Sequence, residues 1–381
     1  MFRRFIVLLF IQTCAIMLRA QSAQVPSPER WVIAQLRPSA AQKDAQFGFS
    51  VAGAGSTVVV YGGGSGGAAY VFVEPSGGWT DMSQTAKLTP AGEVAISSDT
   101  VVTCCSTSSA YVFVKPPDGW VDMSETATLV LPQIVDYFYS VAISGDTVAV
   151  GNAGAAVNGN SQQGAVYVFV KPAGGWTGTI QPVAILTASD GAPGDSLGES
   201  VSIDGDVIAA GAPTPAADGS AYVFVKPSGG WTTMTQTAKL TSAEPQGVGL
   251  ETSVSGNVVL ESGYYAGYVY VEPEGGWADM TETAQLAASP SGFIPNSLSI
   301  SGPHIVMGDP FTNGEPTGLV CLFKEPKDGW QNSTTPNLAF NGGMPNTLAL
   351  GYSVAISGST VVAGAPYANN NSGVAYVAVP K

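Results

Sequence analysis

Few residues in this chain have the types and spacing that catalysis requires. His304 is the single histidine, and it follows a Ser-Gly-Pro turn at the predicted start of a strand, which indicates a solvated strand residue. No Gly-x-Ser-x-Gly motif stands between a strand and a helix, because the chain shows no helical periodicity. We therefore assign no catalytic residue, although a pair of carboxylates distant in the sequence stays open as a hydrolase alternative.

Acidic side chains are the other candidates for chemistry. Five of them lie in the longest connections between predicted strands, which are rich in Asn, Asp, Gly, Ser and Pro: Asp190, Asp195, Asp218, Asp309 and Glu315. Loops vary while a repeated scaffold does not, so function is expected in the loops. Carboxylates gathered along one rim would attract cations or basic partners.

Metal and disulfide chemistry have little support. The cysteines outside the N-terminal leader are Cys104 and Cys105 in the second repeat and Cys321 in the sixth. This odd number gives no disulfide framework, and repeats so far apart around a closed ring would not bring the thiols together. A metal site would need further ligands nearby, so no metal residue is assigned.

The elements that position these residues follow from a repeat that runs along the chain. The clearest copy has two strands, 140–143 and 147–150, joined by a Ser-Gly-Asp turn that is typical of a tight hairpin. A Tyr-Val-Phe-Val strand follows within 164–172, and a fourth strand follows the next tryptophan. Each repeat is thus four strands, with apolar residues on both faces, as expected for a small sheet packed between neighbours.

Counting tryptophans predicts the number of repeats and how the ring closes. Six of them follow a Tyr-Val-Phe-Val-like strand: Trp79, Trp120, Trp176, Trp231, Trp277 and Trp330. Trp31 has no strands before it, whereas the last three strands, within 353–379, have no tryptophan after them. The sequence therefore predicts an all-β, seven-bladed β-propeller with four antiparallel strands per blade, in which residues 31–36 complete blade 7 and close the ring.

The first residues have the layout of a secretory signal. Two arginines precede an apolar run over 5–18, and small residues follow near 20–23. The run is short for a membrane-spanning helix. We therefore expect a signal peptide over 1–23, one propeller domain over 24–381, a secreted or cell-surface location, and no membrane span after removal of the signal.

The charge narrows the choice of partner. The whole chain has 14 basic and 28 acidic residues, a net charge of −14, and loss of the three arginines of the leader would make it −17. So acidic a surface repels phosphate backbones and anionic lipids, which excludes nucleic acid as a partner. The alternative, that the charge only keeps the protein soluble, stays open.

The repeat units resemble FG-GAP repeats, the propeller blades of integrin α-chains and of many exported bacterial proteins. The motif residues are Phe47-Gly48, Leu197-Gly198, Leu350-Gly351, Gly211-Ala212-Pro213, Gly364-Ala365-Pro366 and the variant Gly308-Asp309-Pro310. The resemblance implies calcium in an Asp-rich loop between the first two strands of a blade, but here minimal turns replace that loop. Calcium takes six to eight oxygens. We therefore predict that these calcium sites are lost and that there is no cofactor, and we interpret Asp204 and Asp206 as turn-forming acids.

The predicted function is an exported, non-enzymatic interaction or adhesion module that binds an extracellular protein or glycan through the acidic rim, as the resemblance to integrin α-chains also implies. The alternatives are a polysaccharide-acting hydrolase or lyase, and a purely structural surface component. A deep, carboxylate-lined central pocket would favour the enzyme. The recurrent tyrosines, phenylalanines and tryptophans are expected to pack between blades.

Overall fold

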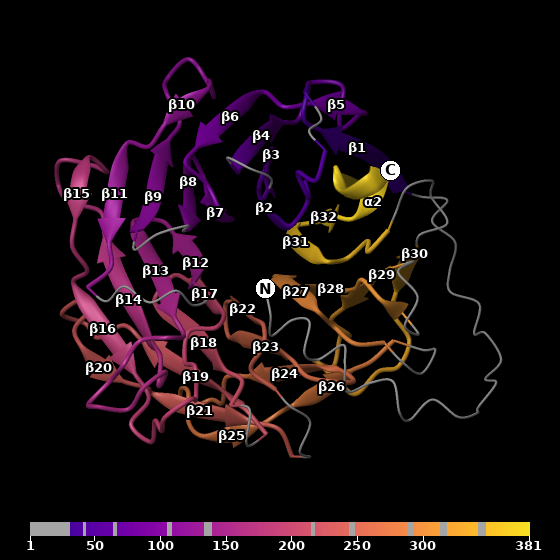
Figure 1. The fold of residues 1–381 in the computed structure, drawn as a ribbon. Helices are drawn as coiled ribbons and strands as arrows, with labels where there is room; N and C mark the ends of the chain where they lie inside the picture. Colours follow the sequence, from indigo (N-terminus) through magenta and orange to yellow (C-terminus); the bar gives the residue numbers. More distant parts are fainter. Residues whose placement is uncertain are drawn as a thin grey trace.

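The computed structural model describes residues 31–40, 43–63, 67–104, 109–132, 139–214, 218–243, 248–288, 293–312, 318–341 and 348–381. The predicted signal peptide, Cys105 and Glu315 lie outside these ranges. The described residues form small sheets arranged around a central axis as a ring (Figure 1). No helix within them is long and apolar enough to cross a membrane.

Seven blades follow one another along the chain, each with four antiparallel strands from the axis outwards. Blade 1 is β2 (Ser50–Ala54), β3 (Thr57–Gly62), β4 (Ala68–Val73) and β6 (Ala86–Thr89); blade 2 is β7 (Glu93–Ser97), β8 (Thr100–Cys104), β9 (Ser109–Val114) and β11 (Ala127–Val130). Blade 3 is β12 (Tyr139–Ser144), β13 (Thr147–Asn152), β14 (Ala165–Val170) and β16 (Ala184–Thr187); blade 4 is β17 (Val201–Asp204), β18 (Val207–Ala212), β19 (Ser220–Val225) and β21 (Ala238–Thr241).

The remaining blades have the same order. Blade 5 is β22 (Thr252–Ser255), β23 (Val258–Ser262), β24 (Gly267–Val271) and β26 (Ala284–Leu286); blade 6 is β27 (Ser297–Ser301), β28 (His304–Asp309), β29 (Leu319–Lys324) and β30 (Leu338–Asn341). Blade 7 is β31 (Ser353–Ser357), β32 (Thr360–Ala365), β33 (Val374–Pro380) and β1 (Trp31–Arg37), with the short α2 (Ala368–Asn371) between β32 and β33.

The first and the last of the described strands meet in blade 7. Strand β1 pairs antiparallel with β33, with Trp31 opposite Pro380 and Leu36 opposite Ala375. The predicted seven-bladed propeller, closed by its N-terminal strand, is confirmed. Because the ring is closed, each blade has a neighbouring blade on both faces of its sheet.

Five sheets have one strand more than the four predicted. The connection between the third and fourth strands of a blade reaches back to the preceding blade and pairs in parallel with its outermost strand. These added strands are β5 (Met82–Ser83), β10 (Met123–Ser124), β15 (Gly178–Ile180), β20 (Met234–Thr235) and β25 (Met280–Thr281). They cover most of the outer edge of the propeller, the part of a sheet that would otherwise present unpaired backbone groups.

The hydrophobic core lies between blades. Among the described residues there are seven hydrophobic clusters, and each takes its members from two neighbouring blades. The six tryptophans that follow the third strands are buried in these clusters, as predicted. Since apolar burial is the main favourable term in folding, each blade depends on both of its neighbours.

The antiparallel order gives the ring two different faces. Hairpins between first and second strands, and connections between third and fourth strands, emerge on one end, which we call the turn face. Connections from second to third strands and from one blade to the next emerge on the other end, which we call the loop face. Of the candidate acidic residues that the structure describes, Asp190, Asp195 and Asp218 lie in loop-face connections, and Asp309 is the last residue of β28, at the same end of the ring.

Candidate interaction surface

Three sets of repeated contacts join the blades, and they account for most of the recurring polar residues. The outermost set uses the second residue after five of the six buried tryptophans, since Gly178, which follows Trp176, has no side chain. The side-chain oxygen of each of these five residues accepts a backbone N–H from the outer strand of the preceding blade: Asp81 from Gln35 at 2.8 Å, Asp122 from Lys87 at 2.7 Å, Thr233 from Ile185 at 3.2 Å, Asp279 from Lys239 at 2.8 Å and Asn332 from Gln285 at 2.8 Å. These carboxylates are therefore structural.

The middle set consists of the Phe-Gly and Gly-Ala-Pro motifs themselves. Gly364 of blade 7 lies directly on the carbonyl oxygen of Gly48 of blade 1, so that a Cβ added to Gly364 would stand 1.9 Å from that oxygen. The same contact joins Gly151 to Gly198 and Gly308 to Gly351. It also joins Gly211 to Gly249, and Gly249 follows Val248 instead of a phenylalanine or leucine. Only glycine permits so close an approach of two backbones. The motifs thus join neighbouring blades.

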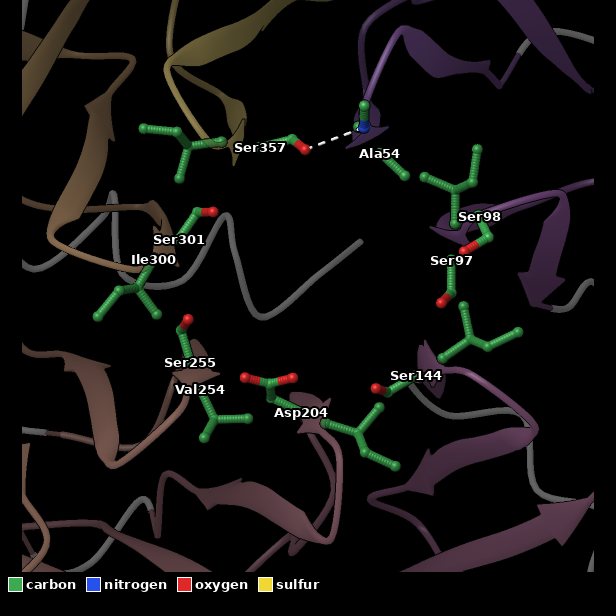
Figure 2. Close-up of a pocket in the computed structure, with 16 residues that line it drawn as sticks. Ala54, Ser97, Ser98, Ser144, Asp204, Val254, Ser255, Ile300, Ser301 and Ser357 are labelled. Carbon is green, nitrogen blue, oxygen red and sulfur yellow. Dashed lines mark hydrogen bonds between the residues drawn. The ribbon is translucent and has the colours of Figure 1, made fainter.

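The innermost set lines a pocket on the axis at the turn face (Figure 2). This pocket has a volume of about 300 Å³ and is walled by the ends of the first strands of all seven blades. Asp204 is the one carboxylate among the described residues that line it, beside several serines. It is not the carboxylate-lined pocket that the hydrolase alternative would need.

Asp190 holds the loop between blades 3 and 4 in place. Its carboxylate accepts hydrogen bonds from the Lys239 ammonium at 2.6 Å and from the Tyr222 hydroxyl at 3.0 Å. Partial burial acts to raise its pKa, but these hydrogen bonds outweigh that effect and leave the pKa below its usual value. Burial, together with the carboxylate, raises the pKa of Tyr222. Asp190 is thus engaged within the protein.

Asp195 and Asp218 differ in their hydrogen bonds and in their exposure to solvent. Asp195 accepts a hydrogen bond from the backbone N–H of Ala192, in its own loop, at 2.7 Å. It accepts another from the Thr214 hydroxyl at 3.4 Å. The side chain of Asp218 is exposed, and its backbone carbonyl accepts a hydrogen bond from Val248 of the next blade at 2.8 Å. Of the acidic residues that the sequence singled out, Asp218 is the one most open to a partner among those described.

Asp309 lies inside the protein. Its residue is only 2% exposed, and its carboxylate accepts backbone N–H groups of Phe311 at 3.0 Å and Ile294 at 3.2 Å. Burial raises its pKa to about 6 although these hydrogen bonds act in the opposite direction. Its place differs from the exposed rim position that the loop composition suggested, because the carboxylate turns inward to bond two backbone donors of its own blade.

A group of exposed side chains that the sequence did not reveal lies at the junction of blades 4 and 5, where Asp218 also lies. Tyr264 and Tyr265, in the loop-face connection of blade 5, are 42% and 65% exposed, and their ring centroids are 6.5 Å apart. Leu250, at the entry to the same blade, is also exposed. We call Asp218, Leu250, Tyr264 and Tyr265 the tyrosine patch. Its signal in the sequence is a Tyr-Tyr pair in a connection where each of the other blades has at most one aromatic residue, Phe311 in blade 6 and Tyr367 in blade 7.

Buried Val248 joins the parts of this patch. Its backbone N–H bonds to Asp218, and a Cβ added to Gly263, next to Tyr264, would lie 3.2 Å from its side chain. The two connections therefore lie against each other at the junction of blades 4 and 5. Exposed aromatic rings beside a carboxylate can stack on an apolar face of a ligand and hydrogen-bond its polar edge.

The remaining candidates for chemistry are placed much as expected. His304 is the first residue of β28 and is partly exposed, with a pKa below its usual value because of burial and nearby Lys324. Cys104 and Cys321 are buried in blades 2 and 6. Across the described ranges, no group of three or more His, Cys, Asp or Glu residues is arranged to hold a metal ion.

Comparison with known proteins agrees with this architecture. The FG-GAP repeat family matches residues 181–224 and 349–378, which include Leu197-Gly198 in blade 4 and Leu350-Gly351 in blade 7. The chain is a seven-bladed β-propeller that carries FG-GAP repeats. No curated protein matches it. Among solved structures, the computationally designed Ika8 protein is similar at 13% identity with a TM-score of 0.48, over 90% of this chain and 98% of that one.

Proposed function

We propose that this protein is an exported, non-enzymatic interaction module that binds an extracellular protein or glycan through its loop face, centred on the tyrosine patch. FG-GAP propellers suggest such a role, and the observation that carries the proposal is the exposed pair Tyr264 and Tyr265, in a connection that packs through Val248 against the one that holds Asp218. Tyrosines are enriched where proteins bind partners, because they bury a large area with little loss of conformational freedom.

The residues that repeat from blade to blade and those that occur once have different contacts, and this difference supports the assignment. Repeated polar residues bind neighbouring blades, whereas the tyrosine patch occurs in one place and makes no repeated contact between blades. Side chains that differ between repeats and remain exposed are the ones available for a partner. The acidic side chains of the loop face would favour a partner with basic or hydrogen-bond-donating groups.

Binding can be tested with a double variant of the patch. The secreted protein is first screened against arrays of extracellular proteins and glycans, and the best partner is then titrated by biolayer interferometry. We expect Tyr264→Ser with Tyr265→Ser to weaken binding of that partner by at least about tenfold. Interface tyrosines often contribute 2 kcal/mol or more, which is about thirtyfold in affinity.

The matched control is Val121→Ser with Val183→Ser, which removes two exposed apolar side chains from the turn face. This control should bind as the unchanged protein does. Equal binding by the tyrosine variant, with its melting temperature preserved, would place the partner elsewhere and overturn the proposal.

Export is part of the same proposal and has its own test. Expressed from its full sequence in a host with a secretory pathway, the protein should appear outside the cytoplasm. Its intact mass should lack a leader of about 23 residues. Retention in the cytoplasm with the full mass would contradict export.

A further inference from the structure

The axial pocket at the turn face is built from one equivalent position in every blade. The last residue of each first strand reaches the pocket: Ala54, Ser97, Ser144, Asp204, Ser255, Ser301 and Ser357. Figure 2 shows the side-chain oxygens of Ser255, Ser301 and Asp204 directed toward the middle of the opening. The isoleucines that also border the pocket, such as Ile143 and Ile300, are only 7% and 6% exposed, so its accessible lining is mainly polar.

A ring of hydrogen bonds holds these polar side chains in place. Each accepts the backbone N–H of the turn in the next blade: Ser97 from Gly145 at 3.1 Å, Ser144 from Gly205 at 3.1 Å, Asp204 from Gly256 at 2.7 Å, Ser255 from Gly302 at 3.1 Å, Ser301 from Gly358 at 3.0 Å and Ser357 from Gly55 at 3.1 Å. The ring is interrupted only after Ala54, which has no side-chain acceptor. The side chains are thus pre-organised, a condition for selective binding.

These bonds decide what the ring has left to offer. A serine oxygen that accepts a peptide N–H still has its own O–H to donate and a second lone pair to accept with. One carboxylate oxygen of Asp204 accepts the backbone N–H of Gly256, and the other remains available to a ligand. The pocket therefore presents several hydroxyl groups and one carboxylate oxygen to a ligand.

The neighbouring acids on the turn face are already paired. Lys115, Lys171 and Lys226 bind Asp99, Asp146 and Asp206 at 3.0, 3.1 and 2.8 Å. None of these six residues lines the pocket, and no lysine, arginine or histidine is among the described residues that do. The pocket thus has no group that would attract an anion.

We propose that the axial pocket binds a neutral polyhydroxylated ligand, a monosaccharide or the end of a glycan chain. Sugar hydroxyls donate and accept hydrogen bonds, as the serine ring does, and two neighbouring hydroxyls can both donate to the Asp204 carboxylate. This site is separate from the tyrosine patch, on the opposite face of the ring.

A bare metal ion suits this space less well. A cation surrounded by its ligands at 2.3–2.6 Å would leave most of a pocket of about 300 Å³ unfilled. Ligand pockets for small organic molecules begin at about this volume. Size and chemistry together favour the sugar.

The test compares two acidic residues that are two positions apart. Asp204→Ser gives blade 4 the residue that five other blades carry, so the hydrogen-bond ring and the fold are kept. Asp206→Ser removes the same charge from an exposed turn residue that is paired with Lys226 outside the pocket. The secreted protein and both variants are titrated with glucose, mannose, galactose and N-acetylglucosamine, followed by saturation-transfer difference NMR and calorimetry.

We expect at least one of these sugars to bind the unchanged protein and the Asp206→Ser variant equally, and to bind Asp204→Ser about tenfold more weakly or not at all. The proposal is overturned if no sugar binds, if Asp204→Ser binds as tightly as the unchanged protein, or if calcium or sodium binds at Asp204 while the sugars do not. Loss of the tyrosine patch should leave this binding intact, which separates the two proposals.

Discussion

At the scale of single residues, blade 5 departs from all the others at two positions on neighbouring strands. Glu261 stands where the equivalent strands have Val60, Thr103, Val150, Ala210, Met307 and Ala363, as the strand registers show. Tyr270 stands where five blades have phenylalanine. Both residues are 0% exposed. Burial raises the pKa of Glu261 to about 8, with nearby Glu282 adding to the effect and the Tyr270 hydroxyl opposing it.

This buried carboxyl makes stability depend on pH. The folded protein keeps the Glu261 proton up to about pH 8, whereas the unfolded chain releases it near the usual value of 4.5. The stabilising contribution is therefore complete below about pH 4.5 and is lost as the pH rises to about 8, by a few kcal/mol in all. The variant Glu261→Val with Tyr270→Phe has the pair of residues that blades 1 and 3 carry. We expect its melting temperature, relative to that of the unchanged protein, to rise steadily from pH 5 to pH 8.

The control for this effect is Tyr270→Phe alone, which keeps the carboxyl and should keep the pH dependence. Thermal unfolding followed by circular dichroism at pH 5, 6, 7 and 8 measures all three proteins. A constant difference between the double variant and the unchanged protein across this range would show that Glu261 ionises in the folded state as it does in the unfolded chain.

Ser98 is a second residue out of pattern. It begins the first hairpin turn of blade 2 with φ of 51°, a conformation that glycine adopts at the same place in the other six blades. A side chain in this left-handed region costs about 1–2 kcal/mol, and the extra freedom of glycine in the unfolded chain cancels roughly half of that. Ser98→Gly should therefore raise stability by about 0.5–1 kcal/mol in thermal unfolding, whereas Ser98→Ala should not. If Ser98→Ala raised the stability as much as Ser98→Gly does, backbone strain at Ser98 would not be the cause.

At the scale of strands and motifs, close backbone contact is the reason for the glycines of the repeat. Gly364 has ordinary backbone angles, so the carbonyl of Gly48 at the position of its missing side chain is what excludes a larger residue. Gly364→Ala should lower stability by roughly 2 kcal/mol or more, because overpacking forces the two blades apart. Gly77→Ala, at a site where a Cβ meets nothing within 4 Å, should change it little. Equal melting temperatures for the two variants would refute this account.

Strand β1 provides the outer strand of blade 7, and it also receives the side chain of Asp81 from blade 1. Removal of residues 31–36 would expose the edge of β33 and part of the apolar surface between blades 7 and 1. We expect the truncated protein to lose its cooperative unfolding transition, as followed by calorimetry. Cooperative melting within a few degrees of the full protein would mean that blade 7 is stable with three strands.

At the scale of the whole molecule, stability rests on seven junctions of similar construction, one between each pair of neighbouring blades. The hairpins between first and second strands have tips of two residues in all seven blades. A tip of this length offers too few oxygens for calcium. Excess calcium or a chelator should therefore change the melting temperature by less than about 1 °C, since a ligand stabilises only if it binds the folded state. A shift of several degrees would reveal a calcium site elsewhere on the ring.

The number of blades, the strand order and the closure by residues 31–36 follow from the sequence, because each repeat carries its own strand pattern and the two incomplete ends complement each other. The recurrent tryptophans were also correctly assigned to packing. These features depend on neighbours in sequence or on the repetition itself, and both can be read along one chain.

The tertiary structure alone decided which loop residues are available to a partner. Asp218 and Asp309 lie in similar connections, yet one is exposed and the other is 2% exposed. The fifth strands, the serine ring around the axis and the burial of Glu261 were likewise not foreseen. Each of them depends on contacts between adjacent blades, and the side-chain environment there is set by a surface some 45–60 residues away, which a pattern within one repeat does not contain.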